Sequence, residues 1–133
     1  MKVVIDTNVL MAALISDSVV RRLLASRKII FYLPEFALDE FEKYKEGLKS
    51  KAGYSEAEFQ QLKSLILENI AIVPIGFVKK HMREAKKVME RVDKKDSPFI
   101  ACAIAIGADG ILSFDKDFQR QKRIKVFGVK ELL

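Results

Sequence analysis

Four acidic residues are the part of this sequence whose types and positions could do chemistry. Asp6, Glu40, Asp96 and Asp115 each stand at the start or end of a predicted element, beside apolar residues that must be buried. A fold that buries those neighbours can bring the four carboxylates together, where they would repel one another, and desolvation would add to the cost. A divalent hard cation such as Mg²⁺ or Mn²⁺, which prefers oxygen ligands, is the simplest neutralising partner.

Asp6 and Glu40 each have a structural alternative. Asp6 follows an apolar run directly and could simply cap the next helix, but Asn8 could supply that cap and free Asp6 for a ligand. On a helical wheel of about 100° per residue, Glu40 flanks an apolar stripe, whereas Asp39 and Glu46 fall on the opposite face. That stripe consists of Ala37, Phe41, Tyr44 and Leu48. Glu40 is therefore predicted to lie near the interior, with a salt-bridged surface glutamate as the alternative.

Asp96 and Asp115 also occupy positions that purely structural acids favour. Asp96 precedes Ser97-Pro98, where an acid favours the dipole of the following helix, and Asp93 lies one turn earlier. Asp115 and Asp117 flank a lysine after a short apolar run, which often indicates only a turn. Asp115 is the nearer of the two to the strand end.

The elements predicted around these acids alternate between strands and helices. Such alternation favours an α/β/α sandwich with a mostly parallel sheet of four to five strands, in which ligands bind beyond the carboxyl ends of the strands. Ser55 and Glu58 match a capping box. The predicted strands are 2–5, 29–33, 70–73, 111–113 and 125–127, and the predicted helices are 9–15, 18–26, 35–49, 55–69 and 97–107, with a further helical stripe formed by Val78, Met82, Ala85, Met89 and Val92.

Length and composition exclude several classes of protein. The chain of 133 residues predicts one domain, 1–133, and a hydrophobic content of 50% argues against global disorder. The longest apolar stretch, 99–106, is too short to span a bilayer, and the N-terminus lacks the basic lead-in of a signal peptide, so a cytoplasmic location is expected. Cys102, the only cysteine, is expected to be a small buried hydrophobe. His81, the only histidine, lies in a Lys/Arg-rich segment, which argues against a zinc site or a Ser-His-Asp enzyme.

The net charge of +6 is unexpected beside an acidic pocket. Excess Lys and Arg favour a polyanionic partner such as nucleic acid, and general solubility is the alternative.

Taken in order, these motifs resemble the PIN-domain family over nearly the whole chain. The segments that carry the resemblance are VVIDTNVL (3–10), LPEFALDEF (33–41), DSPFIACAIAIGAD (96–109) and ILSFDKDF (111–118). Ser113 stands where the family usually has threonine, which keeps the hydroxyl. The resemblance implies a Mg²⁺- or Mn²⁺-dependent ribonuclease that acts on RNA, similar to the small VapC-type prokaryotic toxins, which an antitoxin protein neutralises.

The resemblance also implies roles for individual residues. Asp6, Glu40, Asp96 and Asp115 would be both the metal ligands and the catalytic residues. Residues expected to support them are Asn8, Ser113, Asp93 and Asp117. A homodimer is compatible with this family, and a membrane partner is not expected.

Three functional hypotheses remain open at this point. The first is the metal-dependent endoribonuclease, either a toxin or an RNA-processing or ribosome-maturation enzyme. The second is a phosphotransfer protein of the receiver or haloacid-dehalogenase type, which the absence of a second aspartate two residues after Asp6 disfavours. The third is a non-catalytic RNA-binding scaffold, which retention of all four acids disfavours.

Overall fold

A parallel sheet forms the centre of the protein. The computed structural model describes residues 1–15, 18–90 and 93–133. Its five strands pair in the order β3-β2-β1-β4-β5, and every described pairing is parallel. They are β1 (Lys2–Ile5), β2 (Ile30–Pro34), β3 (Ile70–Val73), β4 (Gly110–Leu112) and β5 (Val126–Phe127). The predicted number of strands is confirmed, with ends that differ by one residue at β2, β4 and β5.

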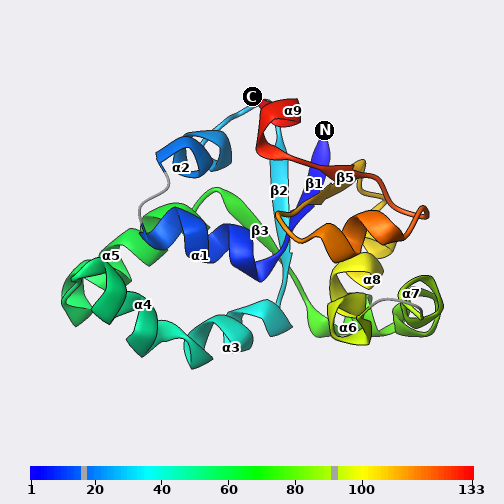
Figure 1. The fold of residues 1–133 in the computed structure, drawn as a ribbon, viewed down its shortest axis with the longest axis horizontal. Coiled ribbons are helices and arrows are strands. Elements are labelled where there is room, and N and C mark those ends of the chain that lie inside the picture. The colour runs from blue at the N-terminus through cyan, green and yellow to red at the C-terminus, as the bar shows by residue number, and fades with distance from the viewer. Residues whose placement is uncertain (16–17, 91–92) are drawn as a thin grey trace.

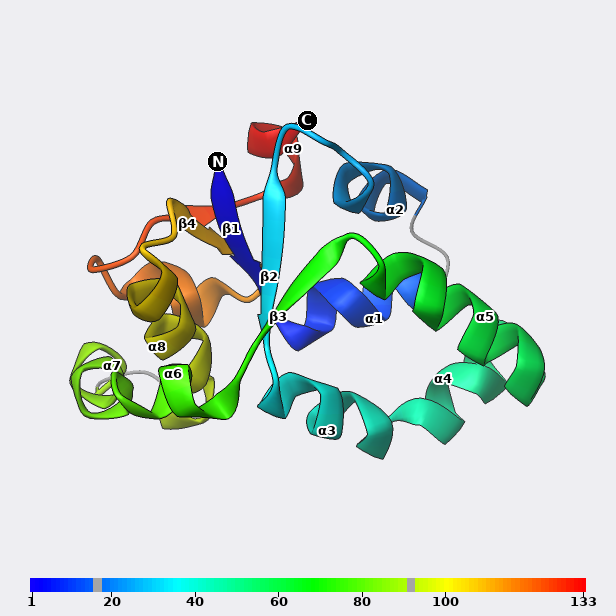
Figure 2. The same ribbon diagram turned by 180° about the vertical axis from the view of Figure 1, so that it is seen from behind.

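Helices cover both faces of this sheet, which gives the expected three-layer sandwich. Helices α1 to α5 lie on one side and α6 to α8 on the other, as the two opposite views show (Figures 1 and 2). The helices are α1 (Thr7–Ile15), α2 (Ser18–Leu24), α3 (Phe36–Lys43), α4 (Lys45–Ala52), α5 (Glu56–Leu67), α6 (Ile75–Lys79), α7 (Met82–Val88), α8 (Ser97–Ile106) and α9 (Val129–Leu132), with two short 3₁₀ turns, η1 (Lys94–Asp96) and η2 (Lys116–Arg120).

The core lies on both faces of the central strands. Val3, Val4 and Ile5 of β1 are completely buried, as expected for a strand with helices on either side. Helix α8 packs against this sheet with a buried run from Phe99 to Ala103. Cys102 belongs to that run, and burial raises the pKa of its thiol to about 12. This confirms the prediction that Cys102 is a packing residue.

The helix predicted over 35–49 is in fact two helices. The chain leaves helical geometry at Tyr44, with φ −101° and ψ 1°, between α3 and α4. Tyr44 is 53% exposed, so its predicted place in the buried stripe is wrong. The break redirects α4 toward α5, where Lys45 and Lys49 both reach Glu56. No Gly or Pro marks this break in the sequence.

Other local predictions are largely confirmed. Ser55 and Glu58 form the predicted capping box at the start of α5, and Gly107 ends α8 in the left-handed region with φ 62°. The stripe predicted through Val78, Ala85 and Met89 is buried, but it is divided between α6 and α7. Val92 of that stripe lies outside the described residues. Helix α9 and the turn η2 were not predicted.

Strand register places the carboxyl ends of β1 and β4 side by side. Ile5 of β1 pairs with Leu112 of β4, and the backbone N–H of Asp6 donates to the Leu112 carbonyl at 3.3 Å. Residues that follow these two strands therefore meet at one edge of the sheet, the lower edge in Figure 1. Among the described residues, every helix is too short or too polar to cross a bilayer.

Candidate functional site

Asp6 and Ser113 meet where β1 and β4 end. Both are buried, with 3% and 4% of their surface exposed. The Ser113 hydroxyl donates to Asp6 Oδ2, and the backbone N–H of Val9 donates to Asp6 Oδ1 at 3.0 Å. Both oxygens of the Asp6 carboxylate are thus held in fixed directions by the fold.

The second of these bonds corrects one sequence argument. Helix α1 begins at Thr7, and Asp6 caps it by accepting from Val9. Asn8 is an exposed residue inside the helix, on a hollow between α1 and α4 that Tyr44 also lines. Asn8 therefore does not cap the helix in place of Asp6. Asp6 caps the helix and still lies where β1 and β4 end.

Asp115 is tied to the same serine. Its backbone N–H donates to Ser113 Oγ at 2.9 Å, so one hydroxyl links Asp6 to the segment that carries Asp115. Asp115 Oδ1 in turn accepts from the backbone N–H of Asp117 at 2.8 Å and caps η2. Asp117 lies farther along, with its carboxylate 3.9 Å from Arg120. The ranking of Asp115 above Asp117 as a site residue stays a prediction.

Asp96 stands at the N-cap position of α8 but makes no capping hydrogen bond with its side chain. Its nearest acidic neighbour in sequence, Asp93, accepts from the backbone N–H of Lys95 at 2.9 Å and so orders the turn η1. The position of Asp96 agrees with the helix-dipole interpretation, and only a capping hydrogen bond from its side chain is absent. Its carboxylate instead interacts electrostatically with the other acids.

Glu40 reaches the site from α3. The helical-wheel argument is confirmed here, because Glu40 is half-buried whereas Asp39 is exposed. The aromatic contact between Phe36 of α3 and Phe99 of α8, with ring centroids 5.2 Å apart, joins the helix that carries Glu40 to the helix that Asp96 precedes.

The negative charges of the other three acids contribute to a raised pKa of Asp96. The pKa of Asp96 is raised to about 7, most strongly by burial and further by the negative charges of its neighbours, which are Asp93, Asp115, Asp6 and Glu40. Burial also raises the pKa of Asp6, against the opposing hydrogen bonds from Ser113 and Val9. We call Asp6, Glu40, Asp96 and Asp115 the carboxylate site.

Two buried hydroxyls beside this site lack hydrogen-bond partners among the described residues. They are Thr7 Oγ1, next to Asp6, and Ser97 Oγ, next to Asp96. A buried hydroxyl without a partner is costly, and such groups often serve a ligand or an ordered water. Neither residue is among the site residues predicted from the sequence. The only available signal was that each directly follows a candidate acid.

The donors present fit a hard divalent cation in their chemistry. All four are carboxylates, and their mutual repulsion is the kind of strain that a cation relieves. Within the described ranges, however, no three acidic, His or Cys side chains lie close enough together to hold an ion by themselves. Mg²⁺ commonly keeps several waters and needs only one or two carboxylates directly, so this spacing is compatible with it.

Comparison with models of known protein families identifies a relationship. The sequence model of the PIN domain matches residues 4–124, which include all four members of the carboxylate site. No curated protein matches the chain. The family match covers most of the sequence and leaves the phosphotransfer alternative without support.

Proposed function

This chain belongs to the PIN-domain family, and from that premise we propose that it is an endoribonuclease that requires Mg²⁺ or Mn²⁺. Proteins of this family are generally nucleases, and they typically use divalent metals. The observation that supports the proposal most is the raised pKa of Asp96, which reflects burial and four neighbouring carboxylates. A site that concentrates negative charge in this way stabilises the folded protein poorly and binds a cation well.

Each member of the carboxylate site has a distinct task in this proposal. Asp6 and Asp96 would hold the cation, because Asp6 is rigidly oriented and Asp96 makes no capping bond. Asp115, ordered by the backbone bond to Ser113, would support them with a third carboxylate. Glu40 approaches from α3 and orients the attacking water.

Ser113 supports these ligands without binding the cation itself. Its hydroxyl holds Asp6 and its oxygen accepts from the Asp115 backbone, so it sets the spacing between two ligands. When bound, a divalent cation lowers the pKa of a coordinated water and relieves charge on the phosphoryl oxygens. The chain's own contribution is to position these carboxylates at the sheet edge and to exclude bulk water around Asp6.

The test is cleavage of RNA by the purified protein. Single-stranded and structured RNA are incubated with Mg²⁺ or Mn²⁺ and, separately, with EDTA. We expect cleavage only with metal, and a loss of several orders of magnitude in Asp96→Asn. The exposed neighbour of Glu40 provides the matched control, because Asp39→Asn removes the same charge away from the site. Cleavage that persists in EDTA, or that survives in Asp96→Asn, would overturn the proposal and favour a non-catalytic scaffold.

The cellular role is tested separately. If the protein is the toxin of a toxin–antitoxin pair, induced expression arrests growth and Asp96→Asn abolishes the arrest. If it serves RNA processing or ribosome maturation, expression leaves growth normal and the purified enzyme cleaves a restricted set of sites.

A further inference from the structure

The positive charge of this protein belongs to one half of its sequence. Residues 74–133 carry 14 Lys and Arg against 8 Asp and Glu, a net charge of +6, whereas residues 1–73 carry 10 of each. Three of the acids in the second half, Asp93, Asp96 and Asp115, belong to the carboxylate site or adjoin it. The remaining surface of that half is therefore strongly basic.

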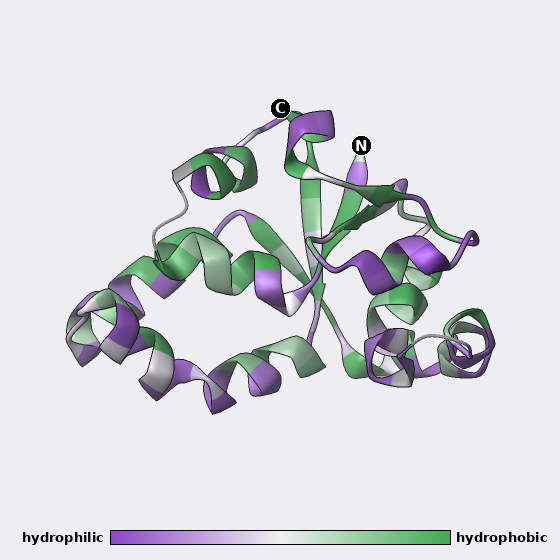
Figure 3. Cartoon of the chain, viewed as in Figure 1, coloured by the Kyte–Doolittle hydropathy of each residue, from purple (hydrophilic) through white to green (hydrophobic). Residues whose placement is uncertain are grey.

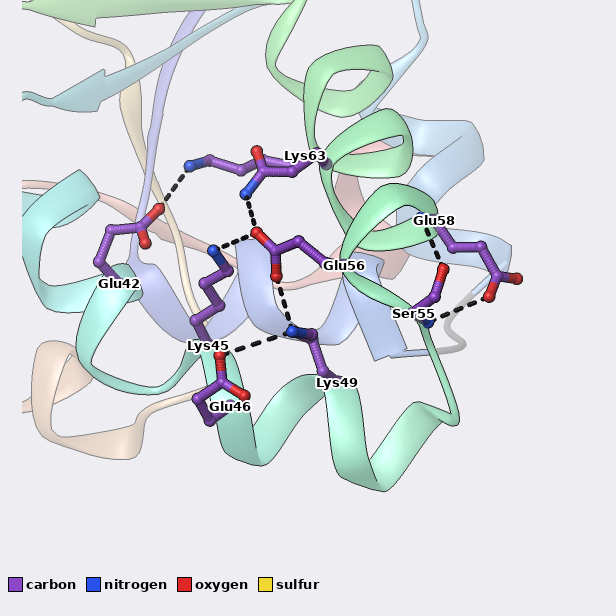
Figure 4. A network of polar contacts seen from close by, with 9 residues as sticks. Glu42, Lys45, Glu46, Lys49, Ser55, Glu56, Glu58 and Lys63 are labelled. Carbon is purple, nitrogen blue, oxygen red and sulfur yellow. Dashed lines mark hydrogen bonds and ion pairs between the residues drawn. The ribbon is translucent and has the colours of Figure 1, made fainter.

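Three of the four lysines on α4 and α5 form ion pairs. Lys45 and Lys49 both contact Glu56, with nitrogen–oxygen distances of 2.5 and 2.6 Å, and Lys63 contacts Glu42 at 2.6 Å (Figure 4). The lysine contacts lower the pKa of Glu56 to about 2. This network leaves little net charge on that side of the molecule for a polyanion.

On the opposite side, cations gather around a hollow of about 310 Å³ between the end of α7 and the end of η2. Its charged lining consists of Lys87, Arg120, Lys122, Arg123 and a single acid, Glu90. We call these four cations the basic hollow. The turn η2 and the segment after it are mostly hydrophilic, whereas α7 mixes hydrophilic and hydrophobic residues (Figure 3).

Partners for these cations are few. Arg123 contacts Glu84 at 3.1 Å, and Arg120 is 3.9 Å from Asp117. Within the described part of the chain, Lys87 and Lys122 form no ion pair. The hollow therefore keeps a positive charge that its own acids do not balance.

A buried glutamine holds the turn that carries two of these cations. Gln121 is 7% exposed, and its side-chain nitrogen donates to the carbonyls of Phe118 and Ile124, each at 2.7 Å. Its side-chain oxygen accepts from the backbone N–H of Ile124 at 2.9 Å. Three hydrogen bonds thus fix the turn through Lys122 and Arg123. Such a preformed turn reduces the entropy lost when the cations bind a ligand.

The turn η2 connects the basic hollow to the carboxylate site along the chain. The turn η2 begins immediately after Asp115 and ends at Arg120, and five residues of 3₁₀ geometry span about 10 Å. On the other side of the hollow, α7 ends at Val88, eight residues before Asp96 in the sequence. A strand of RNA held in the hollow would therefore extend toward the carboxylates.

We propose that the basic hollow binds the phosphate backbone of single-stranded RNA and leads it to the carboxylate site. This inference rests on the proposed function and names the surface that selects the substrate. Phosphates provide the complementary charge, and Arg and Lys are the side chains that bind them in proteins. RNA enters over α7 and η2, while the ion-paired face of α4 and α5 makes no contribution.

The test compares two triple variants that change net charge equally. The first, Lys87→Gln, Arg120→Gln and Lys122→Gln, removes three cations of the hollow. The second, Arg27→Gln, Lys43→Gln and Lys51→Gln, removes one arginine and two lysines that are exposed in the neutral half. Binding of a short fluorescein-labelled single-stranded RNA is followed by anisotropy in EDTA, which prevents metal-dependent cleavage, over about 50 to 200 mM salt.

Loss of phosphate contacts should appear in the salt dependence. Each contact to a single strand contributes about 0.7 to the slope of log K against log salt, so the hollow variant should lose a slope of about 2 and bind at least tenfold more weakly. The control variant should keep nearly the wild-type slope. Equal weakening in both variants would reduce the effect to net charge and overturn the inference, as would wild-type binding by the hollow variant.

This outcome can be separated from the test of the proposed function. If the wild-type protein binds RNA through the hollow but never cleaves it with metal, the proposed function fails and the RNA surface stands. If the wild-type protein cleaves RNA and the hollow variant does so with unchanged KM, the proposed function stands and the RNA surface is wrong.

Discussion

Replacing Asp96 with asparagine should make the metal-free protein more stable. The substitution keeps the shape of the side chain and removes one negative charge from the carboxylate site. The pKa of Asp96 rises from 3.8 to about 7 in the folded protein. Three pKa units correspond to about 4 kcal/mol. Asp96 is only half-buried, so solvent screening reduces the usable part to about 1–2 kcal/mol.

The size of this stability difference depends on pH. Between about pH 4 and pH 7 the folded protein keeps the Asp96 proton, whereas the unfolded chain releases it. The free energy of unfolding of the wild-type protein therefore falls as the pH rises through this window, and the loss is complete above it. Asparagine does not titrate. The free energy of unfolding of the variant should equal that of the wild-type protein near pH 4 and exceed it by about 1–2 kcal/mol near pH 8.

Urea denaturation followed by circular dichroism in EDTA, at both ends of this pH window, measures the difference. Addition of Mg²⁺ or Mn²⁺ should reverse the order, because only the wild-type protein gains the full free energy of metal binding. Asp39→Asn is the control and should leave the unfolding curve unchanged at both pH values. The reasoning is refuted if Asp96→Asn is the less stable protein near pH 8, since Asp96 would then make a stabilising contact.

Two further substitutions test the packing that positions the site. Ser113→Ala should lower the free energy of unfolding by about 1–2 kcal/mol and weaken Mn²⁺ binding, measured by calorimetry, by about 10- to 100-fold, because Asp6 and Asp115 lose their common partner. The control Ser113→Thr keeps the hydroxyl and should retain most of the Mn²⁺ affinity. An equal loss of affinity in both variants would show that packing alone is responsible. Gly110→Ala places a Cβ 2.5 Å from the Phe127 ring and 2.7 Å from the Lys125 carbonyl, so thermal unfolding should show a loss of about 1–3 kcal/mol. Its control, Gly47→Ala, has open space in a helix and should be neutral or stabilising; an unaffected Gly110→Ala protein would show that β5 can move.

Local signals in the sequence account for the parts of the fold that were predicted correctly. The capping box at Ser55 and the run from Ser97 to Gly107 combine a start signal with an end signal, and the buried run of β1 matches a strand covered on both faces. The break at Tyr44 has no such signal. After the break, α4 meets α5 through ion pairs between residues 7 and 11 positions apart in the sequence, and a short motif does not reveal such contacts.

The same contrast applies to the carboxylate site. Helical periodicity was enough to separate Glu40 from Asp39, and the order of strands was enough to place Asp6 and Asp115 at one edge. The hydroxyl of Ser113 could be proposed as a support, but its link between two acids depends on the register of β1 and β4. The unpartnered hydroxyls of Thr7 and Ser97 depend on the packing of whole helices, which no short motif encodes.

Loss of Asp6 and loss of Asp96 should change the stability of the folded protein in opposite directions, and this difference has an evolutionary consequence. Asp6 caps α1 and is fastened to β4 through Ser113, so the architecture depends on it even without catalysis. Asp96 makes no capping bond, and its negative charge destabilises the metal-free folded protein. In a lineage that abandons RNA cleavage, selection for stability would retain Asp6 and would favour neutral replacements of Asp96. Descendants that are no longer enzymes should therefore be recognisable by an intact aspartate after the first strand and a missing one before the helix that covers the sheet.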